Sequence, residues 1–176
     1  ALSSSFTILF LFWTSTRILR KLALKSSGIT PTKTIAIFGG AVVGSLAYAF
    51  SDSFWFSAVE GEVYAMSSLF TALVFWAILK WDAVATEKHS VRWIVFIAYL
   101  MGLSIGVHLL NLLAIPAMVF LYYFKTRELN LKNFAKATGI SVLVLGIVQF
   151  VIIPGTVKVG AMFELFFVNS VGLPFN

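Results

Sequence analysis

The stretch "WIVFIAYLMGLSIGVHLLNLLAIPAMVFLYYF", residues 93–124, decides how often this chain can cross a membrane. It stays apolar for 32 residues. As one helix it would be roughly 48 Å long at 1.5 Å per residue, whereas the hydrocarbon core of a bilayer is about 30 Å thick. Glycines, a proline and the polar side chains of His108 and Asn111 lie near its middle. We therefore predict two short helices, 93–107 and 109–124, with a break near Ser104 to His108.

Composition extends this prediction to the whole chain. Apolar residues make up 60% and charged residues 11% of the 176 positions, so the chain is far more apolar than a soluble domain. We predict an all-α, polytopic transmembrane helical bundle that forms one domain over 1–176. Its six membrane segments are expected at about 1–16, 34–50, 63–81, 93–107, 109–124 and 137–154. The chain begins with Ala1 within an apolar run, which we interpret as an internal piece of a longer protein.

Two details of these segments carry expectations of their own. Gly39, Gly40 and Gly44 in the second segment predict close contact with a neighbouring helix, as small residues do in membranes. The tail 155–176 is apolar and aromatic but contains Lys158 and Glu164. We expect it to form an outer interfacial or re-entrant element rather than a seventh span.

Basic residues assign the loops to the two sides of the membrane. Short loops rich in Lys and Arg mark the cytoplasmic side. Twelve of the thirteen basic residues lie in 17–33, 80–92 and 125–136, and six alternating spans place all three of these segments on one side. The acidic loop 51–62 is then extracytoplasmic. The basic residues report orientation, so the net charge of +6 does not require a nucleic-acid partner.

The outer loop contains the acidic candidates for a site. Asp52 has a ready explanation as an ordinary polar loop residue. Glu60 and Glu62 lie in an otherwise aromatic and apolar loop directly before a membrane segment, where a carboxylate can also stabilise the start of a helix. Ionisable residues near membrane depth are functional candidates, and Glu62 is the stronger of the two because Gly61 separates Glu60 from the helix.

A second polar group of candidates lies at the break. His108 and Asn111 are three residues apart and share a helical face. They either hold the break together through hydrogen bonds or form the wall of a pocket that contacts a phosphate or a sugar hydroxyl. Lys158, the remaining basic residue on the outer side, either neutralises a donor phosphate or anchors the chain at the interface. The chain has no cysteine and no motif for nucleotide binding or a hydrolase nucleophile.

Three blocks carry a family resemblance: "FWFSAVEGEVYAMSSLFTALVFWAILKW", "YLMGLSIGVHLLNLLAIPA" and "FFVNSVGLPFN". They resemble a bacterial multi-pass family, domain-of-unknown-function family 2723, which is similar to the GT-C membrane glycosyltransferases and particularly to protein O-mannosyltransferases. The resemblance covers essentially the whole chain. The acidic Asp-Cys-Gly-Glu motif of that family is missing here, so no catalytic base is carried over from it.

The resemblance implies a function and a set of partners. It implies sugar transfer from a polyprenyl-phosphate donor to an acceptor protein or glycan, on the outer face of the bacterial inner membrane. It implies Glu62 and then Glu60 as catalytic acids, with Tyr64, His108 and Asn111 contacting substrate, beside Lys158 and Asp52. The cofactor is unknown. A divalent metal bound by the outer carboxylates is an open alternative, although their spacing does not support it. A transporter or lipid-handling protein and a non-catalytic assembly subunit are the alternatives.

Overall fold

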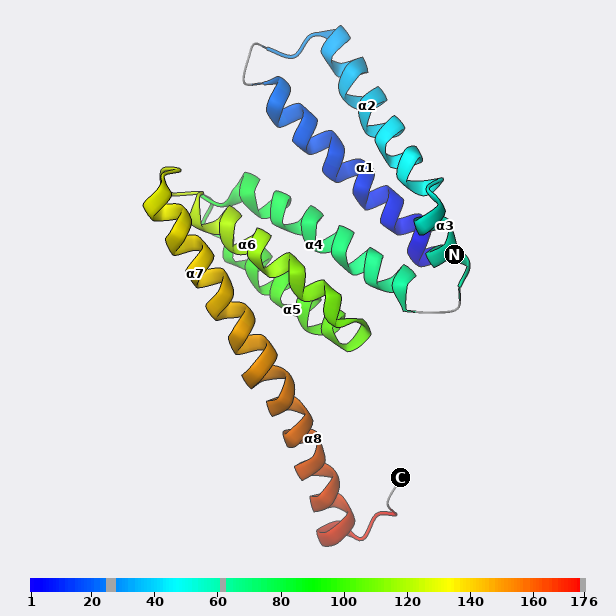
Figure 1. Cartoon of the computed structure of the whole chain (residues 1–176), viewed down its shortest axis with the longest axis vertical. Coiled ribbons are helices and arrows are strands. Elements are labelled where there is room, and N and C mark those ends of the chain that lie inside the picture. The colour runs from blue at the N-terminus through cyan, green and yellow to red at the C-terminus, as the bar shows by residue number, and fades with distance from the viewer. Residues whose placement is uncertain (25–27, 61–62, 175–176) are drawn as a thin grey trace. The chain divides into compact units, whose positions relative to one another are not determined.

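The computed structural model describes residues 1–24, 28–60 and 63–174, and within them every regular element is a helix, as predicted (Figure 1). The contacts divide the chain into two compact units, Ala1–Ala114 and Ile115–Asn176. The single domain over 1–176 stays a prediction, and each unit is described by itself.

The first unit is a group of helices packed around α1 and α4. Its elements are α1 (Leu2–Ala23), α2 (Pro31–Ala49), α3 (Asp52–Val59), α4 (Tyr64–Val84), α5 (Val91–Val107) and the 3₁₀ turn η1 (Leu109–Leu113). Helix α1 packs against both α2 and α4, and α4 also packs against α5. Phe10 contacts Trp76, and Lys21 pairs with Asp82, so α1 and α4 run in the same direction.

Helix α1 is longer than the predicted segment 1–16, because it continues through the basic run to Ala23. Arg and Lys are good helix formers and can extend their charged groups beyond an apolar surface. The salt bridge between Lys21 Nζ and Asp82 Oδ2, at 2.7 Å, fastens this end of α1 to α4.

Helix α2 packs through a stripe that differs from the predicted one. Its first turn is capped by the Thr30 hydroxyl, which accepts a hydrogen bond from the backbone N–H of Lys33 at 3.3 Å. Ile37, Ala41 and Ser45 are buried and follow each other at four-residue spacing. The prediction of close contact at all three glycines is wrong in part. A Cβ built on Gly40 would lie 3.4 Å from Leu19 Cδ1, whereas one on either of the other two would meet nothing within 4 Å.

The apolar run 93–124 has the break that the sequence predicts. Helix α5 ends at Val107, and His108 has an extended backbone with φ −160° and ψ 129°. The chain then makes the η1 turn and continues as α6 (Ala114–Tyr123). Extended backbone at His108 cannot continue an α-helix, so the run forms two shorter helical pieces instead of one.

The second unit contains one long helix. This unit also includes α6 from Ile115 onward. The long helix consists of α7 (Leu131–Ile147), a π-helical turn η2 (Val148–Ile152), α8 (Ile153–Phe166) and a second π-helical turn η3 (Phe167–Val171). These join into one apolar helix of 41 residues, Leu131–Val171. It ends at Gly172, whose φ of +81° is a left-handed conformation that glycine adopts readily.

The helix extends beyond the predicted membrane segment 137–154 at both ends and runs without interruption into the residues for which a separate outer element is predicted. The helix begins earlier because the Asn130 side chain caps it, accepting from the Asn133 N–H at 2.8 Å. It continues past Pro154 because the π turn directly before the proline widens the helix. The ring and the missing N–H of proline would otherwise conflict with a regular turn.

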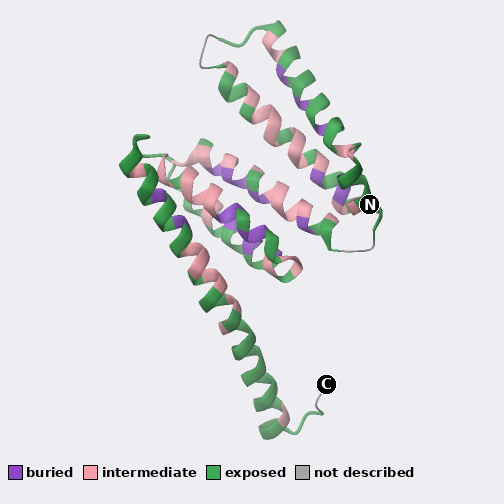
Figure 2. Cartoon of the chain, in the orientation of Figure 1, coloured by how far each residue is buried: buried purple, intermediate pink, exposed green. Residues whose placement is uncertain are grey.

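The helices fit a membrane protein by length and composition. Within the described residues, four helices are long and apolar enough to cross a membrane: Leu2–Ala23, Pro31–Ala49, Tyr64–Val84 and Leu131–Val171. These helices carry many exposed large apolar side chains. Figure 2 shows exposed positions in green along them. Such surfaces are unfavourable in water and suit a hydrocarbon environment.

Candidate functional site

Asn111 is the centre of a buried polar cluster in the first unit. Its side chain is 3% exposed and lies on η1. Its Oδ1 accepts hydrogen bonds from Ser67 Oγ at 3.0 Å and from Thr71 Oγ1 at 2.7 Å, both on α4. Its Nδ2 donates to the backbone oxygen of Ser104 on α5 at 3.4 Å. The amide therefore ties three elements together at the helix break.

The break itself exists because of local hydrogen bonds around His108. The His108 N–H donates to Ser104 O at 2.9 Å, which closes the last turn of α5. Nδ1 of His108 accepts from the Leu110 N–H at 3.0 Å and so caps the η1 turn. A ring nitrogen that accepts a hydrogen bond carries no proton, so the proton of the neutral ring lies on Nε2. Nε2–H is then available as a donor.

Tyr64 joins the cluster from the start of α4. Its ring lies 5.6 Å from the His108 ring, centroid to centroid, at an interplanar angle of 48°. Tyr64 is 42% exposed and His108 is half-buried. Three of the predicted site residues, Tyr64, His108 and Asn111, thus lie together, with two of them able to present polar groups to a ligand.

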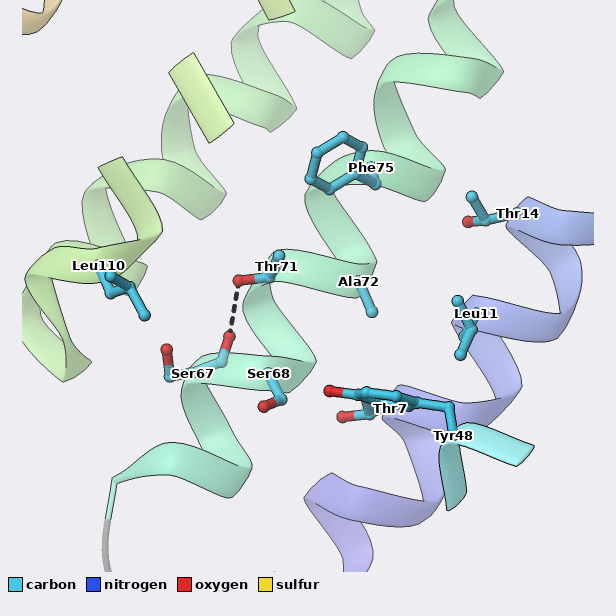
Figure 3. Close-up of a pocket in the computed structure, with 10 residues that line it drawn as sticks. All are labelled: Thr7, Leu11, Thr14, Tyr48, Ser67, Ser68, Thr71, Ala72, Phe75 and Leu110. Atoms are coloured by element: carbon cyan, nitrogen blue, oxygen red, sulfur yellow. Dashed lines mark hydrogen bonds between the residues drawn. The ribbon is translucent and has the colours of Figure 1, made fainter. Parts of the chain in front are cut away.

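A cavity of about 410 Å³ lies beside this cluster, between α1 and α4 (Figure 3). The residues that line it are Thr7, Leu11, Thr14, Tyr48, Ser67, Ser68, Thr71, Ala72, Phe75 and Leu110. Figure 3 shows α1 and α4 contributing side chains from opposite walls, with Tyr48 reaching in from the end of α2. Ser67 and Thr71 belong to both the cavity wall and the Asn111 cluster.

The hydroxyl groups that line the cavity differ in the hydrogen bonds that they already form. Thr7 donates to the backbone oxygen of Ser3 at 2.8 Å, the usual bond of a threonine within a helix. The buried Thr14 Oγ1 has no hydrogen-bond partner in the described structure. Thr71 can donate its single proton either to Asn111 or to the Ser67 backbone oxygen, 3.1 Å away. The wall can therefore exchange hydrogen bonds with a hydroxylated ligand.

The chemistry of the cavity is binding rather than proton transfer. Among the described residues that line it, Tyr48 is the only ionisable one. Hydroxyl groups set in apolar walls suit a ligand with both sugar-like and apolar parts. A general base for transfer to an acceptor would have to come from outside this wall.

The acidic candidates lie at separate positions along the segment before α4. Glu60 ends α3 in an extended conformation and is exposed. A carboxylate at the C-terminal end of a helix is not favoured by the helix dipole, so capping does not explain Glu60. Asp52 lies in the first turn of α3, where the dipole does favour an acid. Glu62, the main catalytic candidate, lies outside the described residues.

Lys158 lies on α8 in the second unit, where it is exposed. It is thus not one of the residues that the first unit brings together around Asn111. Among the described residues, no three His, Asp or Glu side chains lie close enough together to hold a metal ion.

Sequence reasoning missed the hydroxyl residues of the site. Ser67 and Thr71 in "SSLFT" are four residues apart and share one face of α4, and Thr7 and Thr14 are two turns apart on α1. That spacing, polar positions aligned along one face of an apolar segment, is a readable signal. It identifies a polar face but not which helix lies opposite to it.

The comparisons with known proteins agree with the predicted relationship at the level of the enzyme class. The family described as "Protein O-mannosyl-transferase TMEM260 N-terminal domain" matches residues 1–131, which include all the described residues of the polar cluster and the cavity. No curated protein and no solved structure matches the chain significantly.

Proposed function

Because this chain belongs to the family of protein O-mannosyl-transferase TMEM260 N-terminal domains, we propose that it forms the sugar-transferring part of a membrane glycosyltransferase. The family relationship implies a sugar donor and an acceptor. In our proposal the donor is a polyprenyl-phosphate sugar, with mannose as the sugar that the family name suggests, and the acceptor is a protein or glycan.

The observation that carries this proposal is the cavity between α1 and α4 beside the Asn111 cluster. Its apolar residues, such as Leu11 and Phe75, suit a polyprenyl chain, and its hydroxyl groups suit a sugar. Tyr64 and His108 add an exposed tyrosine and an Nε2–H donor at the same end of α4. These features support binding of a lipid-linked sugar within a hydrocarbon environment.

The proposed roles divide binding from catalysis. Glu62 acts as the general base that accepts the proton of the acceptor hydroxyl, and Glu60 has a smaller part in the same reaction. Tyr64, His108 and Asn111 contact or position the substrate, and Lys158 neutralises the donor phosphate. Asp52 is the weakest member of the set, because its place in the first turn of α3 already has a structural explanation.

The proposed location of the reaction is the extracytoplasmic face of the membrane. In the first unit, Tyr64 and His108 meet at one end of α4, whereas Lys21 and Asp82 meet near its other end. The acid-containing segment and the basic segment are thus at opposite ends of the same helix. This separation supports a topology in which the basic end faces the cytoplasm.

The decisive experiment compares Glu62→Gln with Glu60→Gln in the full-length protein. Glutamine keeps the shape and most of the hydrogen bonding of glutamate but removes the basicity. We expect Glu62→Gln to insert and fold normally and to lose transfer from polyprenyl-phosphate mannose about 100-fold or more, as expected for a general base. Glu60→Gln should lose much less.

Melting temperatures measured on both variants separate catalysis from stability. Mild and equal losses of activity that follow the melting temperatures would leave both acids with a structural role alone. Full activity in Glu62→Gln would remove Glu62 from the site.

A transporter is the second candidate, and the interrupted helix at His108 is the observation that favours it. Carriers place substrate at breaks in membrane helices, where backbone and polar groups become available. Uptake of a sugar-phosphate lipid into proteoliposomes without formation of a glycosylated product would support the carrier and contradict the transferase.

A further inference from the structure

A second cavity, of about 300 Å³, lies between α1 and α4 towards their C-terminal ends. Trp13, Thr16, Arg17, Arg20, Trp76 and Lys80 line it. On these two helices the hydroxyl-lined cavity takes its residues mostly from earlier positions, Thr7 to Thr14 and Ser67 to Phe75, and none of them lines the second cavity. The two cavities therefore have different positions on the helix pair and different chemistry.

The lining of this second cavity is cationic. It contains Arg17, Arg20 and Lys80 and no described carboxylate. None of the three forms an ion pair with a described residue. Close by, Lys21 pairs with Asp82 at 2.7 Å, so a carboxylate is available at this end of the helices but neutralises another cation. Like charges that converge on one cavity repel each other, and an anion bound between them would remove that repulsion.

The aromatic residues that line the cavity indicate its level in the membrane. The rings of Trp13 and Trp76 lie 6.1 Å apart, and Lys80 Nζ lies 5.4 Å from the centroid of the Trp76 ring. Tryptophan gathers at the interface of a membrane, at the level of the lipid headgroups. A preference of basic residues for the cytoplasmic side explains their presence at this end but not their convergence on one cavity.

We propose that this cavity is a binding site for the phosphate group of an anionic membrane lipid. Guanidinium groups of Arg17 and Arg20 present paired donors that match the oxygens of a phosphate, and Lys80 adds a compact positive charge. The tryptophan rings flank the lipid backbone below the headgroup. Basic pockets between membrane helices bind anionic headgroups in this manner.

The site is independent of sugar transfer and is tested by binding alone. The full-length protein in detergent micelles is titrated with short-chain phosphatidylglycerol, with short-chain phosphatidylcholine and with inorganic phosphate. Tryptophan fluorescence is the readout, because Trp13 and Trp76 line the cavity. We expect saturable binding of phosphatidylglycerol and no comparable response to the other two.

Matched variants assign the binding to the cavity. Arg17→Gln and Arg20→Gln should each weaken phosphatidylglycerol binding about tenfold or more, the effect of losing a charged hydrogen bond. Arg17→Lys, which keeps the charge and loses the paired donors, should weaken binding less than Arg17→Gln. Lys88→Gln, an exposed charge in the loop after α4, should leave the affinity unchanged.

Two outcomes would overturn the proposal. Equal weakening by Arg17→Gln and Lys88→Gln would show diffuse attraction by net charge rather than a site. Inorganic phosphate binding as tightly as phosphatidylglycerol would assign the cavity to free phosphate and remove the lipid from the proposal. Sugar-transfer activity affects neither result, so failure here leaves the proposed function to its own test.

Discussion

The two units are both apolar, but they differ in what they bury. The long helix Leu131–Val171 contains a more apolar window than any of the long helices of the first unit, yet only 6% of that window is buried. Its buried residues are Ala137 and Ser141. Figure 2 shows more buried positions in the first unit than along the long helix. The polar side chains buried in the first unit are Ser4, Thr7, Ser45, Ser67, Ser104 and Asn111.

The difference shows that apolarity alone does not make helices pack in this protein. Lipid is as apolar as leucine, so helices in a membrane associate through small residues, close contact and hydrogen bonds. The first unit supplies these through Ala41, Ala77 and the Asn111 cluster. The long helix of the second unit supplies few, and its apolar surface remains exposed.

The largest expected effect concerns whether both units follow one membrane topology. The chain has no cysteine, so single cysteines can be placed freely. We expect Ser53→Cys to react fully with an impermeant thiol reagent added outside intact cells. Thr86→Cys in the first unit and Leu129→Cys in the second should both resist it. Labelling at Thr86→Cys without labelling at Ser53→Cys would invert the topology and place the acids in the cytoplasm.

The next effect tests the buried cluster against a matched residue of the long helix. Asn111→Leu leaves the Ser67 hydroxyl without its partner and removes one of two hydrogen bonds from both the Thr71 hydroxyl and the Ser104 oxygen. Because an unsatisfied buried group costs about 1–3 kcal/mol, we expect a total loss of about 3 kcal/mol in the free energy of unfolding. Asn169→Leu, at an exposed position of η3, should change it by less than about 0.5 kcal/mol. Thermal unfolding in detergent measures both, and equal shifts would contradict the comparison.

A smaller effect is expected from apolar packing. Ile78→Ala removes a side chain that is 2% exposed in α4, and the cavity should cost about 2 kcal/mol, the low end of the range for buried isoleucine. We use the low end because an isoleucine side chain that leaves the protein interior enters lipid, which is also apolar, rather than water. Ile140→Ala on α7, which is 41% exposed, is the control and should be nearly neutral. A neutral Ile78→Ala would show that α4 is loosely packed.

The smallest effect concerns the N-caps of α2 and α7. Here we expect a substitution in the second unit to cost more stability than the matched substitution in the first unit. Thr30 caps α2 with a hydrogen bond of 3.3 Å, whereas Asn130 caps α7 with one of 2.8 Å. We expect Asn130→Ala to destabilise its helix start by about 1 kcal/mol and Thr30→Ala by about 0.5 kcal/mol. Amide hydrogen exchange in the first turn of each helix measures the two losses. A larger loss at Thr30 would mean that tertiary contacts, and not the caps, hold these turns.

Much of the fold could be predicted because membrane helices carry strong local signals. The length of the run 93–124, set against the thickness of a bilayer, together with its glycines, proline and polar side chains, predicted a break near Ser104 to His108, and helix α5 ends there. The end of the last helix could not be predicted in the same way. Pro154 ordinarily ends a helix, and the π turn that accommodates it is a local adjustment with no clear sequence pattern.

The site was predictable only for the side chains that stand out from their surroundings. His108, Asn111 and Tyr64 are unusual in an apolar chain, and the structure brings them together. Ser67 and Thr71 were missed because hydroxyl groups can satisfy themselves within their own helix. Their bonds to Asn111 join residues 40 or more positions apart, which a single sequence cannot reveal.

The π turn η2 has a consequence for any helix that lies along the second unit. A π turn contains one residue more than an α turn, and one extra residue displaces the helical face by about 100°. The stripe marked by Ala137 and Ser141 on α7 is therefore out of phase with the side chains of α8. A straight neighbour in contact with that stripe would meet a different side of α8 beyond Ile152. The faces that α7 and α8 turn toward such a neighbour therefore differ, and they are rotated from each other around the helix axis.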